Sequence, residues 1–190
     1  MSKRLSDMTL EELWQLFPII LEEHKSCWTD WFVEEKIDLE RSLPQNVRIS
    51  HIGSTAVPNI WAKPIVDILV EIESGMDSIK DALIGNGYVC MSESVNRISF
   101  NKGYTENGFA ERVFHLHLRY MGDNDEIYFR DYLIENPDIA KEYEKLKLGL
   151  WKQFEHNRDE YTNQKTEFVR KYTEIAKEQR KFPDWRVKGN

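Results

Sequence analysis

The amino-acid sequence predicts an α+β protein: a mixed β-sheet of four or five strands flanked by helices, with a helical N-terminal segment and C-terminal helices. Apolar residues recur every three or four positions before residue 46 and again from Ile127 onward, which is helical periodicity. Between them lie short alternating or apolar runs bounded by Gly and Pro, which are typical of strands. A chain of 190 residues fits one domain. We therefore expect a single domain with a helical N-terminal segment (1–46), a sheet core (47–120) and C-terminal helices (121–190).

The N-terminal segment should form two helices. Apolar residues at helical spacing run through 9–23, Thr9 is suited to be the N-cap, and Pro18 should kink or split this stretch. A second pattern from 27 to 43 favours another helix. The break at 43–46 ends that helix, because the residue before a proline is disfavoured in helical conformation.

The sheet core should alternate strands with turns and one helix. The strongest strand signal is the strict alternation of apolar and polar residues at 114–119. Long helices, and then a basic tail, are expected from Ile127 onward. The other expected elements are strands at 47–52, 65–72 and 88–91, a helix at 76–86, and a hairpin from 97 to 113 that turns at Lys102-Gly103.

Composition limits the class of partner. The formal net charge of -7 provides no global basic field, so long duplex DNA or RNA is not an expected partner. Hydrophobic residues make up 41% and charged residues 31%, a globular balance that argues against a membrane protein. Cys27 and Cys90 form no CxxC or disulfide pattern, and the charged N-terminus lacks the apolar run of a signal peptide. We expect a cytoplasmic protein, whose oligomeric state the sequence does not determine.

A small, hydroxyl-bearing turn follows the first expected strand. In the segment His51-Ile-Gly53-Ser54-Thr55, the glycine permits close backbone approach, and Ser54 or Thr55 adds a hydroxyl to amides that can hold phosphate oxygens. Asp67 follows thirteen positions after Ser54, inside the apolar run of the next strand. A carboxylate is costly to bury there unless it is paired, hydrogen-bonded or metal-bound. This layout suits phosphate and a divalent metal, with Asp67 as the candidate catalytic residue.

Several blocks of the sequence resemble a known family. The segment 51–58, His-Ile-Gly-Ser-Thr-Ala-Val-Pro, followed by 62–70, Ala-Lys-Pro-Ile-Val-Asp-Ile-Leu-Val, closely resembles the signature of the GrpB family. That family belongs to the polymerase-beta-like nucleotidyltransferase superfamily, so the resemblance implies a nucleotidyltransferase-like fold. The helices before Leu43 carry no matching motif. The likeness continues in His115-Leu-His117, Phe129-Arg130-Asp131-Tyr132-Leu133, Asn136-Pro137 and Tyr161-Thr162-x-x-Lys165.

The resemblance also implies a metal site. In the superfamily, an acidic-x-acidic pair and a third acidic residue bind two Mg²⁺ ions that bridge a nucleoside triphosphate. Asp67 matches the first acid, but Leu69 stands at the second position, and Glu71 lies about 13 Å further along the strand. On the strand of the third acid, His115 and His117 share a face and can ligate a metal, although ordinary hydrogen bonds are an equal interpretation. We expect Asp67, His115 and His117 to hold a divalent metal, Mg²⁺ or Mn²⁺, with Zn²⁺ as an option because of the imidazoles.

Phosphate binding in an acidic protein requires local cations. The candidates in family-like blocks are Lys63, Lys102, Arg130 and Lys165. Each is also consistent with a solvated surface charge, and the run from 141 to 152 is interpreted as a solvated helix face.

Three functions remain open at this stage. The first is a nucleotidyltransferase-like enzyme that transfers a nucleoside monophosphate from a triphosphate to a small-molecule acceptor by metal-assisted in-line displacement. The second is a non-catalytic nucleotide-binding or metabolite-binding module with a degenerate metal site, which Leu69 favours. The third is a metal-dependent phosphohydrolase, for which the two histidines are the argument. The expected partners are a nucleotide and a small molecule, not a long nucleic acid or a membrane.

Overall fold

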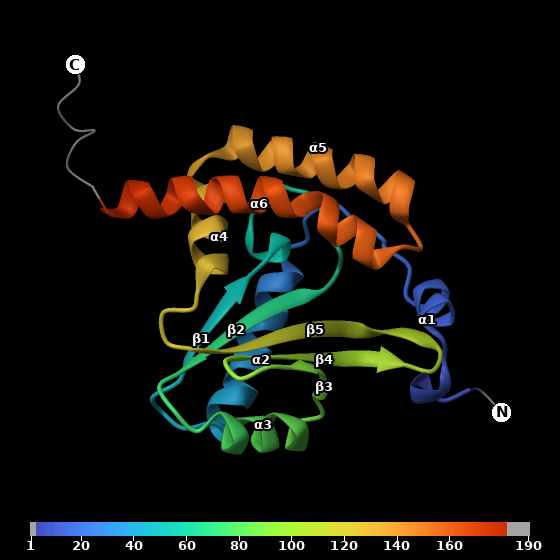
Figure 1. The fold of residues 1–190 in the computed structure, drawn as a ribbon, viewed down its shortest axis with the longest axis vertical. Coiled ribbons are helices and arrows are strands. Elements are labelled where there is room, and N and C mark those ends of the chain that lie inside the picture. Colours follow the sequence, from blue (N-terminus) through green and yellow to red (C-terminus); the bar gives the residue numbers. More distant parts are fainter. Residues whose placement is uncertain (1–2, 182–190) are drawn as a thin grey trace.

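The computed structural model describes residues 3–181 and contains one five-stranded sheet with helices around it (Figure 1). The strand order is β1-β2-β5-β4-β3. Only β2 and β5 run parallel, and the other neighbours are antiparallel, so the predicted α+β class with a mixed sheet is confirmed. The strands are β1 (Arg48–Ile52), β2 (Val66–Ile72), β3 (Val89–Glu93), β4 (Arg97–Thr105) and β5 (Gly108–Tyr120).

The helices lie close to where the sequence predicts them. In α1, a capping box joins Thr9 and Glu12, and the helix ends before Pro18. The helical segments are η1 (Leu5–Asp7), α1 (Leu10–Leu16), α2 (Cys27–Ser42), η2 (Ser54–Ala56), α3 (Met76–Gly85), α4 (Asp125–Glu135), α5 (Pro137–Phe154) and α6 (Arg158–Lys181). Within residues 3–181, none of these helices combines the length and the apolar character needed to cross a membrane. The end of the expected basic tail, 182–190, lies outside the described residues.

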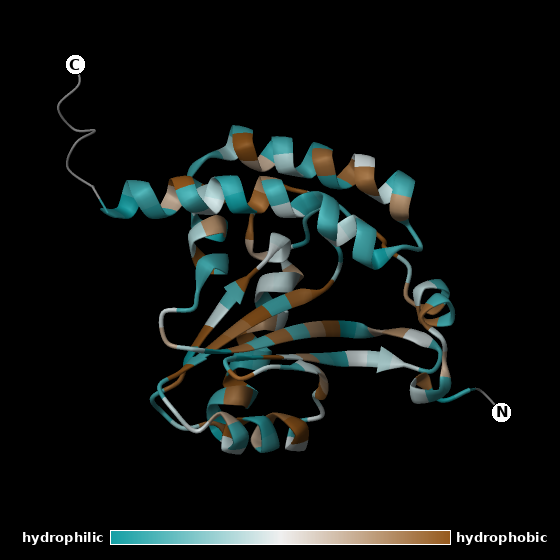
Figure 2. Cartoon of the chain, in the orientation of Figure 1, coloured by the Kyte–Doolittle hydropathy of each residue, from teal (hydrophilic) through white to brown (hydrophobic). Residues whose placement is uncertain are grey.

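The two faces of the sheet differ in chemistry because side chains alternate along a strand. One face of β2 carries Val66, Ile68 and Val70, which join α2 and α3 in the main hydrophobic cluster. The opposite face carries Asp67, beside His115 of the neighbouring strand. Helices α4, α5 and α6 lie together, at the end of the molecule away from α3 (Figure 1). Figure 2 shows that residues of the central strands are largely apolar and that those of α6 are largely hydrophilic.

The hairpin between β4 and β5 corrects the predicted turn. The chain turns at Glu106-Asn107, and Lys102-Gly103 lies within β4, where the pairing register with β5 shifts. Gly103 has a φ of 91°, and a Cβ at this position would lie 2.3 Å from the backbone oxygen of Arg112. The glycine therefore permits a bulge at close backbone approach, rather than a reversal of the chain.

Candidate functional site

The Gly53-Ser54 turn lies directly against Asp67. Strand β1 pairs with β2 so that Ile52 faces Asp67, and the next residue, Gly53, has a φ of 71°. A Cβ on Gly53 would lie 2.2 Å from Asp67 Oδ2, so a side chain here would displace the carboxylate. The glycine is thus required both for its backbone conformation and for the close approach of the turn to the acid.

Two histidines extend from β5 toward the same carboxylate. Asp67 pairs with His115 across the parallel strands, and His117 follows two residues later on the same face. His115 Nδ1 lies 3.3 Å and His117 Nε2 4.0 Å from Asp67 Oδ1. Burial disfavours the ionised form of Asp67, but the contacts with these imidazoles outweigh it and hold the pKa of the carboxyl well below its usual range.

Four cations from separate parts of the chain gather around this carboxylate. Lys147 of α5 is 2% exposed, and its Nζ donates a hydrogen bond to Ser54 Oγ at 2.9 Å and another to the Trp61 carbonyl. Arg158, at the start of α6, lies 3.3 Å from His115 Nε2. The other two cations share an aromatic partner, since the Nζ atoms of Lys165 and Lys63 lie 4.3 and 5.5 Å from the centre of the Tyr161 ring.

Burial and the proximity of the lysines to one another lower their pKa values. Burial, together with neighbouring cations that include Lys165, lowers the pKa of Lys63 to about 7. Burial and Lys165 likewise lower the pKa of Lys147 to about 7, and burial lowers that of Lys165 to about 8 although Asp67 opposes it. These ammonium groups are partly compensated by tyrosine rings, by Glu144 beside Lys147 and by the central Asp67 carboxylate, so the cluster of cations suits a further anion.

Comparisons with known proteins place the chain in a family. A profile of the GrpB protein family matches residues 18–175, which is most of the chain. The chain belongs to the GrpB family. The sequence-based expectation of this family is therefore confirmed, and the match begins at residue 18, before Leu43, where no family motif was recognised.

A solved relative of this GrpB-family chain shares its fold, and a further relative is similar in sequence. It is similar to the crystal structure of the conserved protein GrpB from Enterococcus faecalis, with a TM-score of 0.72 and 33% identity over 83% of this chain and 96% of that chain. It is 36% identical to the UPF0157 protein YqkA of Bacillus subtilis over 86% of its own length, but spans only 48% of that protein. A weaker likeness to the Cid1 poly(U) polymerase, with a TM-score of 0.48 and 14% identity over 68% of this chain and 43% of that chain, carries no argument about activity.

The side chains of three predicted site residues form hydrogen bonds or ion pairs with residues other than Asp67 and the lysines around it. The Thr55 hydroxyl contacts His51 Nε2 at 2.9 Å and the Ile65 carbonyl at 3.3 Å, and the residue is 1% exposed. Lys102 extends from the apolar face of the sheet, where it forms an ion pair with Glu35 at 2.7 Å. Arg130 donates to the His51 carbonyl at 2.6 Å and pairs with the neighbouring Asp131. The structure therefore brings Gly53, Ser54, Lys63, Lys165 and the predicted metal ligands together. The side chains of Thr55, Lys102 and Arg130 are engaged with other partners.

The sequence reading missed several residues of the site, and Lys147 most clearly. It assigned 141–152 to a solvated face, but Lys147 lies on the buried side of α5. The sequence does indicate that Lys147 is buried, because Tyr143 precedes it and Leu150 follows it at helical spacing, which places all three on the apolar stripe of the helix. Tyr143 shares this helical stripe, and Tyr161 stands in a family-like block, but neither was assigned to the site. Arg158 and Tyr104 were also missed, and the local sequence gives no comparable signal for them.

The donor set does not match the magnesium centre of three carboxylates that the family resemblance implies. Leu69 stands at the second acidic position and is fully buried in the core. In the described part of the chain, no group of three or more His, Cys, Asp and Glu side chains is placed to hold a metal ion. The assignment of a metal to Asp67, His115 and His117 stays a prediction, and the surrounding cations favour an anion at this place.

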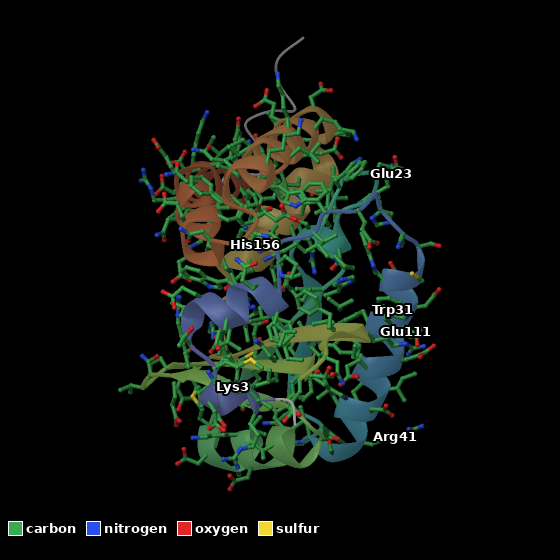
Figure 3. All side chains as sticks on the ribbon, turned by 90° about the vertical axis from the view of Figure 1, so that its right-hand side faces the viewer. Lys3, Glu23, Trp31, Arg41, Glu111 and His156 are labelled. Atoms are coloured by element: carbon green, nitrogen blue, oxygen red, sulfur yellow. The ribbon has the colours of Figure 1, made fainter. Side chains whose placement is uncertain are left out.

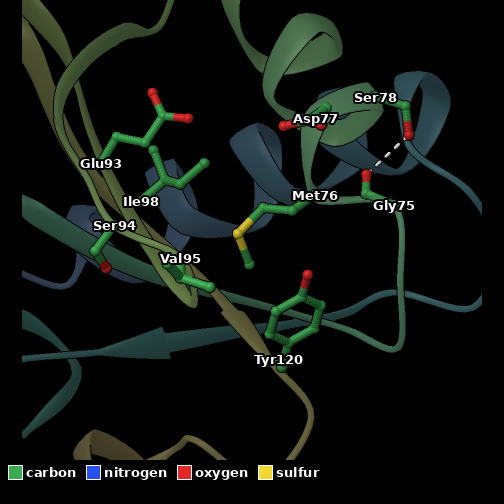
Figure 4. A pocket seen from close by; sticks show the side chains of 9 residues that line it. All are labelled: Gly75, Met76, Asp77, Ser78, Glu93, Ser94, Val95, Ile98 and Tyr120. Carbon is green, nitrogen blue, oxygen red and sulfur yellow. Dashed lines mark hydrogen bonds between the residues drawn. The ribbon is translucent and has the colours of Figure 1, made fainter.

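Features elsewhere on the surface differ from this site. Figure 4 shows a cavity between the start of α3 and the β3–β4 hairpin, at the opposite end of β2 from Asp67. Its lining includes the acids Asp77 and Glu93 and no basic side chain, so it does not suit an anion. On another side, the ring of Trp31 of α2, labelled in Figure 3, lies 5.7 Å from the Arg112 guanidinium of β5. That contact is an ordinary surface pair.

Proposed function

We propose that this chain binds a nucleoside triphosphate, with the phosphates among Lys63, Lys147, Lys165 and Arg158 beside the Gly53-Ser54 turn. One observation carries the proposal: cations from the β1–β2 connection, α5 and α6 converge on the Asp67 carboxylate, and one of them, Lys147, is buried. Burying ammonium groups beside one another is unfavourable. An anionic ligand offsets that cost.

The family resemblance suggests the reaction within this proposal. A hydroxyl of a small-molecule acceptor attacks the α-phosphorus, and a new P–O bond forms while the bond from the α-phosphorus to the bridging oxygen of the β-phosphate breaks. Pyrophosphate leaves, and the hydroxyl proton passes to solvent. Asp67 faces the turn that holds the phosphates and is the acid that matches the superfamily pattern. The divalent metal, Mg²⁺ or Mn²⁺ with Zn²⁺ as an option, belongs to this proposal and not to the observed geometry.

A second candidate is a module that binds a nucleotide without turnover, and Leu69 favours it. This side chain is fully buried and contributes no oxygen, so the second metal-binding carboxylate of the superfamily pattern is absent at its position. Binding without product formation would then be the whole function. The third candidate, a phosphohydrolase, would release phosphate in the presence of a transition metal.

The test compares binding and turnover in matched variants. Titration calorimetry with ATP, GTP, CTP, UTP and pyrophosphate, each with Mg²⁺, Mn²⁺, Zn²⁺ or a chelator, measures affinity. Lys147→Met should weaken binding roughly tenfold or more, since a hydrogen bond to a charged group contributes about 1.5 to 3 kcal/mol. Lys145→Met is the control, because Lys145 lies on the exposed side of the same helix. Equal affinities for wild type and both variants, or no binding of any phosphate compound, would overturn the proposal.

Turnover separates the candidate reactions. Pyrophosphate release that requires a divalent metal and an acceptor supports transfer, and phosphate release supports hydrolysis. Tight binding with neither product supports the binding module.

A further inference from the structure

The contacts around Asp67 determine which atoms of the two histidines carry hydrogen. An arginine side chain has only donors, and an ionised carboxylate has only acceptors. A neutral imidazole has one nitrogen of each kind, so a neighbour of known type on one nitrogen defines the other. Both His115 and His117 lie between such neighbours.

His115 lies between Asp67 and an arginine. Its Nε2 is 3.3 Å from Arg158 Nη2, so that nitrogen accepts. Tyr104 lies 2.8 Å from the same nitrogen and accepts from Arg158 Nη1 at 3.2 Å, so its hydroxyl hydrogen is free to point at Nε2. The Tyr104 ring packs on Phe17 at 4.7 Å, which holds the phenol in place. The hydrogen of His115 is therefore on Nδ1, the nitrogen 3.3 Å from Asp67 Oδ1.

His117 repeats this arrangement with the opposite nitrogen. Arg119 Nη2 lies 3.3 Å from His117 Nδ1, which accepts, so the hydrogen of His117 is on Nε2. That nitrogen is the one at 4.0 Å from Asp67 Oδ1. Arg119 is itself 6% exposed and donates to the carbonyls of Ile98 at 3.3 Å and Leu118 at 3.0 Å, so its position is defined by the backbone of the sheet.

The two imidazoles thus direct N–H groups at one oxygen of the acid. The other oxygen, Oδ2, faces Gly53, since a Cβ there would lie 2.2 Å from it. We propose that His115 and His117 are positioning residues whose N–H groups face Asp67 Oδ1, in tautomers set by Arg158 and Arg119, so that Oδ2 alone acts on a ligand at the Gly53-Ser54 turn. His115 is near enough to donate, at 3.3 Å, whereas His117, at 4.0 Å, acts through the partial positive charge of its N–H group and not through a hydrogen bond. This assigns the histidines a role other than the predicted metal ligation. The role of Oδ2 rests on the proposed function, whereas the tautomers do not.

Nitrogen NMR of the ligand-free protein tests the tautomers. Two-bond ¹H–¹⁵N spectra at neutral pH should show His115 with hydrogen on Nδ1 and His117 with hydrogen on Nε2, and His115→Gln and His117→Gln assign the signals. Addition of ZnCl₂ should leave both rings unchanged. The opposite tautomer in either ring, or coordination of Zn²⁺ by both rings, would overturn the proposal. His24 and His156, which lie outside the site, serve as internal controls.

Variants test the causes. Arg119→Met should convert His117 to a mixture of tautomers while His115 stays unchanged; if it fails to fold, the wild-type spectrum still decides. Asp67→Asn and Asp67→Ala should both preserve the two tautomers, because Arg158 and Arg119 still donate to the opposite nitrogens of the rings. Loss of the tautomers in either Asp67 variant would refute their assignment to the arginines.

The link to the proposed function is tested separately. Asp67→Asn should abolish Mg²⁺-dependent ATP binding while its tautomers persist, and unchanged Mg²⁺-dependent binding would refute the role of Oδ2. Correct tautomers without any ATP binding by the wild type would refute the proposed function, and with it the role of Oδ2, but not the positioning of Asp67.

Discussion

Replacement of Lys63 by methionine should make the protein more stable. The Lys63 ammonium lies over the Tyr161 ring, with the cations Lys165 and Arg158 as neighbours. Methionine has a similar length and keeps the apolar contact with the ring, but it carries no charge. If the cation is retained for a ligand and not for the fold, its removal should release the cost of burying it.

The magnitude follows from the pKa of the lysine. Burial and the neighbouring cations lower this pKa from 10.5 to about 7. At about 1.4 kcal/mol per pKa unit, the shift corresponds to a penalty of about 4 kcal/mol at pH 7. Because Lys165 and Arg158 contribute to it and adapt when the charge is removed, we expect a net gain of about half, or ~2 kcal/mol, and a rise in Tm of roughly 4 to 8 °C.

The sign of the pH dependence provides an independent check. Between pH 7 and 10.5 the unfolded chain holds the Lys63 proton and the folded protein does not, so the wild type becomes more stable relative to the variant as the pH rises. Urea unfolding at pH 7 and pH 9 should therefore show a smaller advantage of Lys63→Met at pH 9. The control is Lys171→Met, whose Nζ lies 4.8 Å from the Tyr172 ring but is exposed, and which should change stability little. A variant no more stable than wild type at pH 7, or an advantage that grows toward pH 9, would refute the reasoning.

Three further predictions concern Asp67, Gly53 and the lysines around them. Pyrophosphate affinity measured by calorimetry should fall about tenfold between pH 6 and pH 9, because Lys147 and Lys165, with pKa values of about 7 and 8, lose their charges in that interval; a constant affinity would show that these ammonium groups do not bind it. Gly53→Ala should lower the free energy of unfolding by about 3 kcal/mol or more, since steric overlap with the carboxylate adds to the strain of a positive φ. Gly87→Ala is the control, because Gly87 has a φ of 84° but open space around it, so only the backbone strain applies and the free energy of unfolding should fall by about 1 to 2 kcal/mol. Equal losses of stability for the two variants in urea titrations would contradict the steric overlap at Gly53. Without Mg²⁺, Asp67→Asn should bind pyrophosphate more tightly than wild type, because a negative charge among the cations is removed, and weaker binding would argue that Asp67 positions the lysines.

Local sequence patterns determined most of the fold. The alternation at 114–119 and the apolar run at 65–72 correspond to buried stretches of two adjacent strands, and Thr9 forms its predicted cap. These features follow from side-chain periodicity and from backbone groups a few residues apart, which depend little on the rest of the chain. The prediction of a turn at Lys102-Gly103 was wrong, because a glycine in a β-bulge and a glycine in a turn cannot be told apart from the sequence.

The sequence by itself also determined the family and the centre of the site, Gly53 and Asp67, since the motif joins neighbouring strands. Only the tertiary structure decided which cations surround them. Lys147 and Arg158 lie on helices far along the chain, and Lys102 points to the other face of the sheet. Helical spacing places Lys147 on the apolar stripe of α5, but the local sequence does not determine which other residues that stripe contacts. Its surroundings are set by the packing of α5 and α6 against the rest of the chain, which depends on contacts between residues distant in sequence.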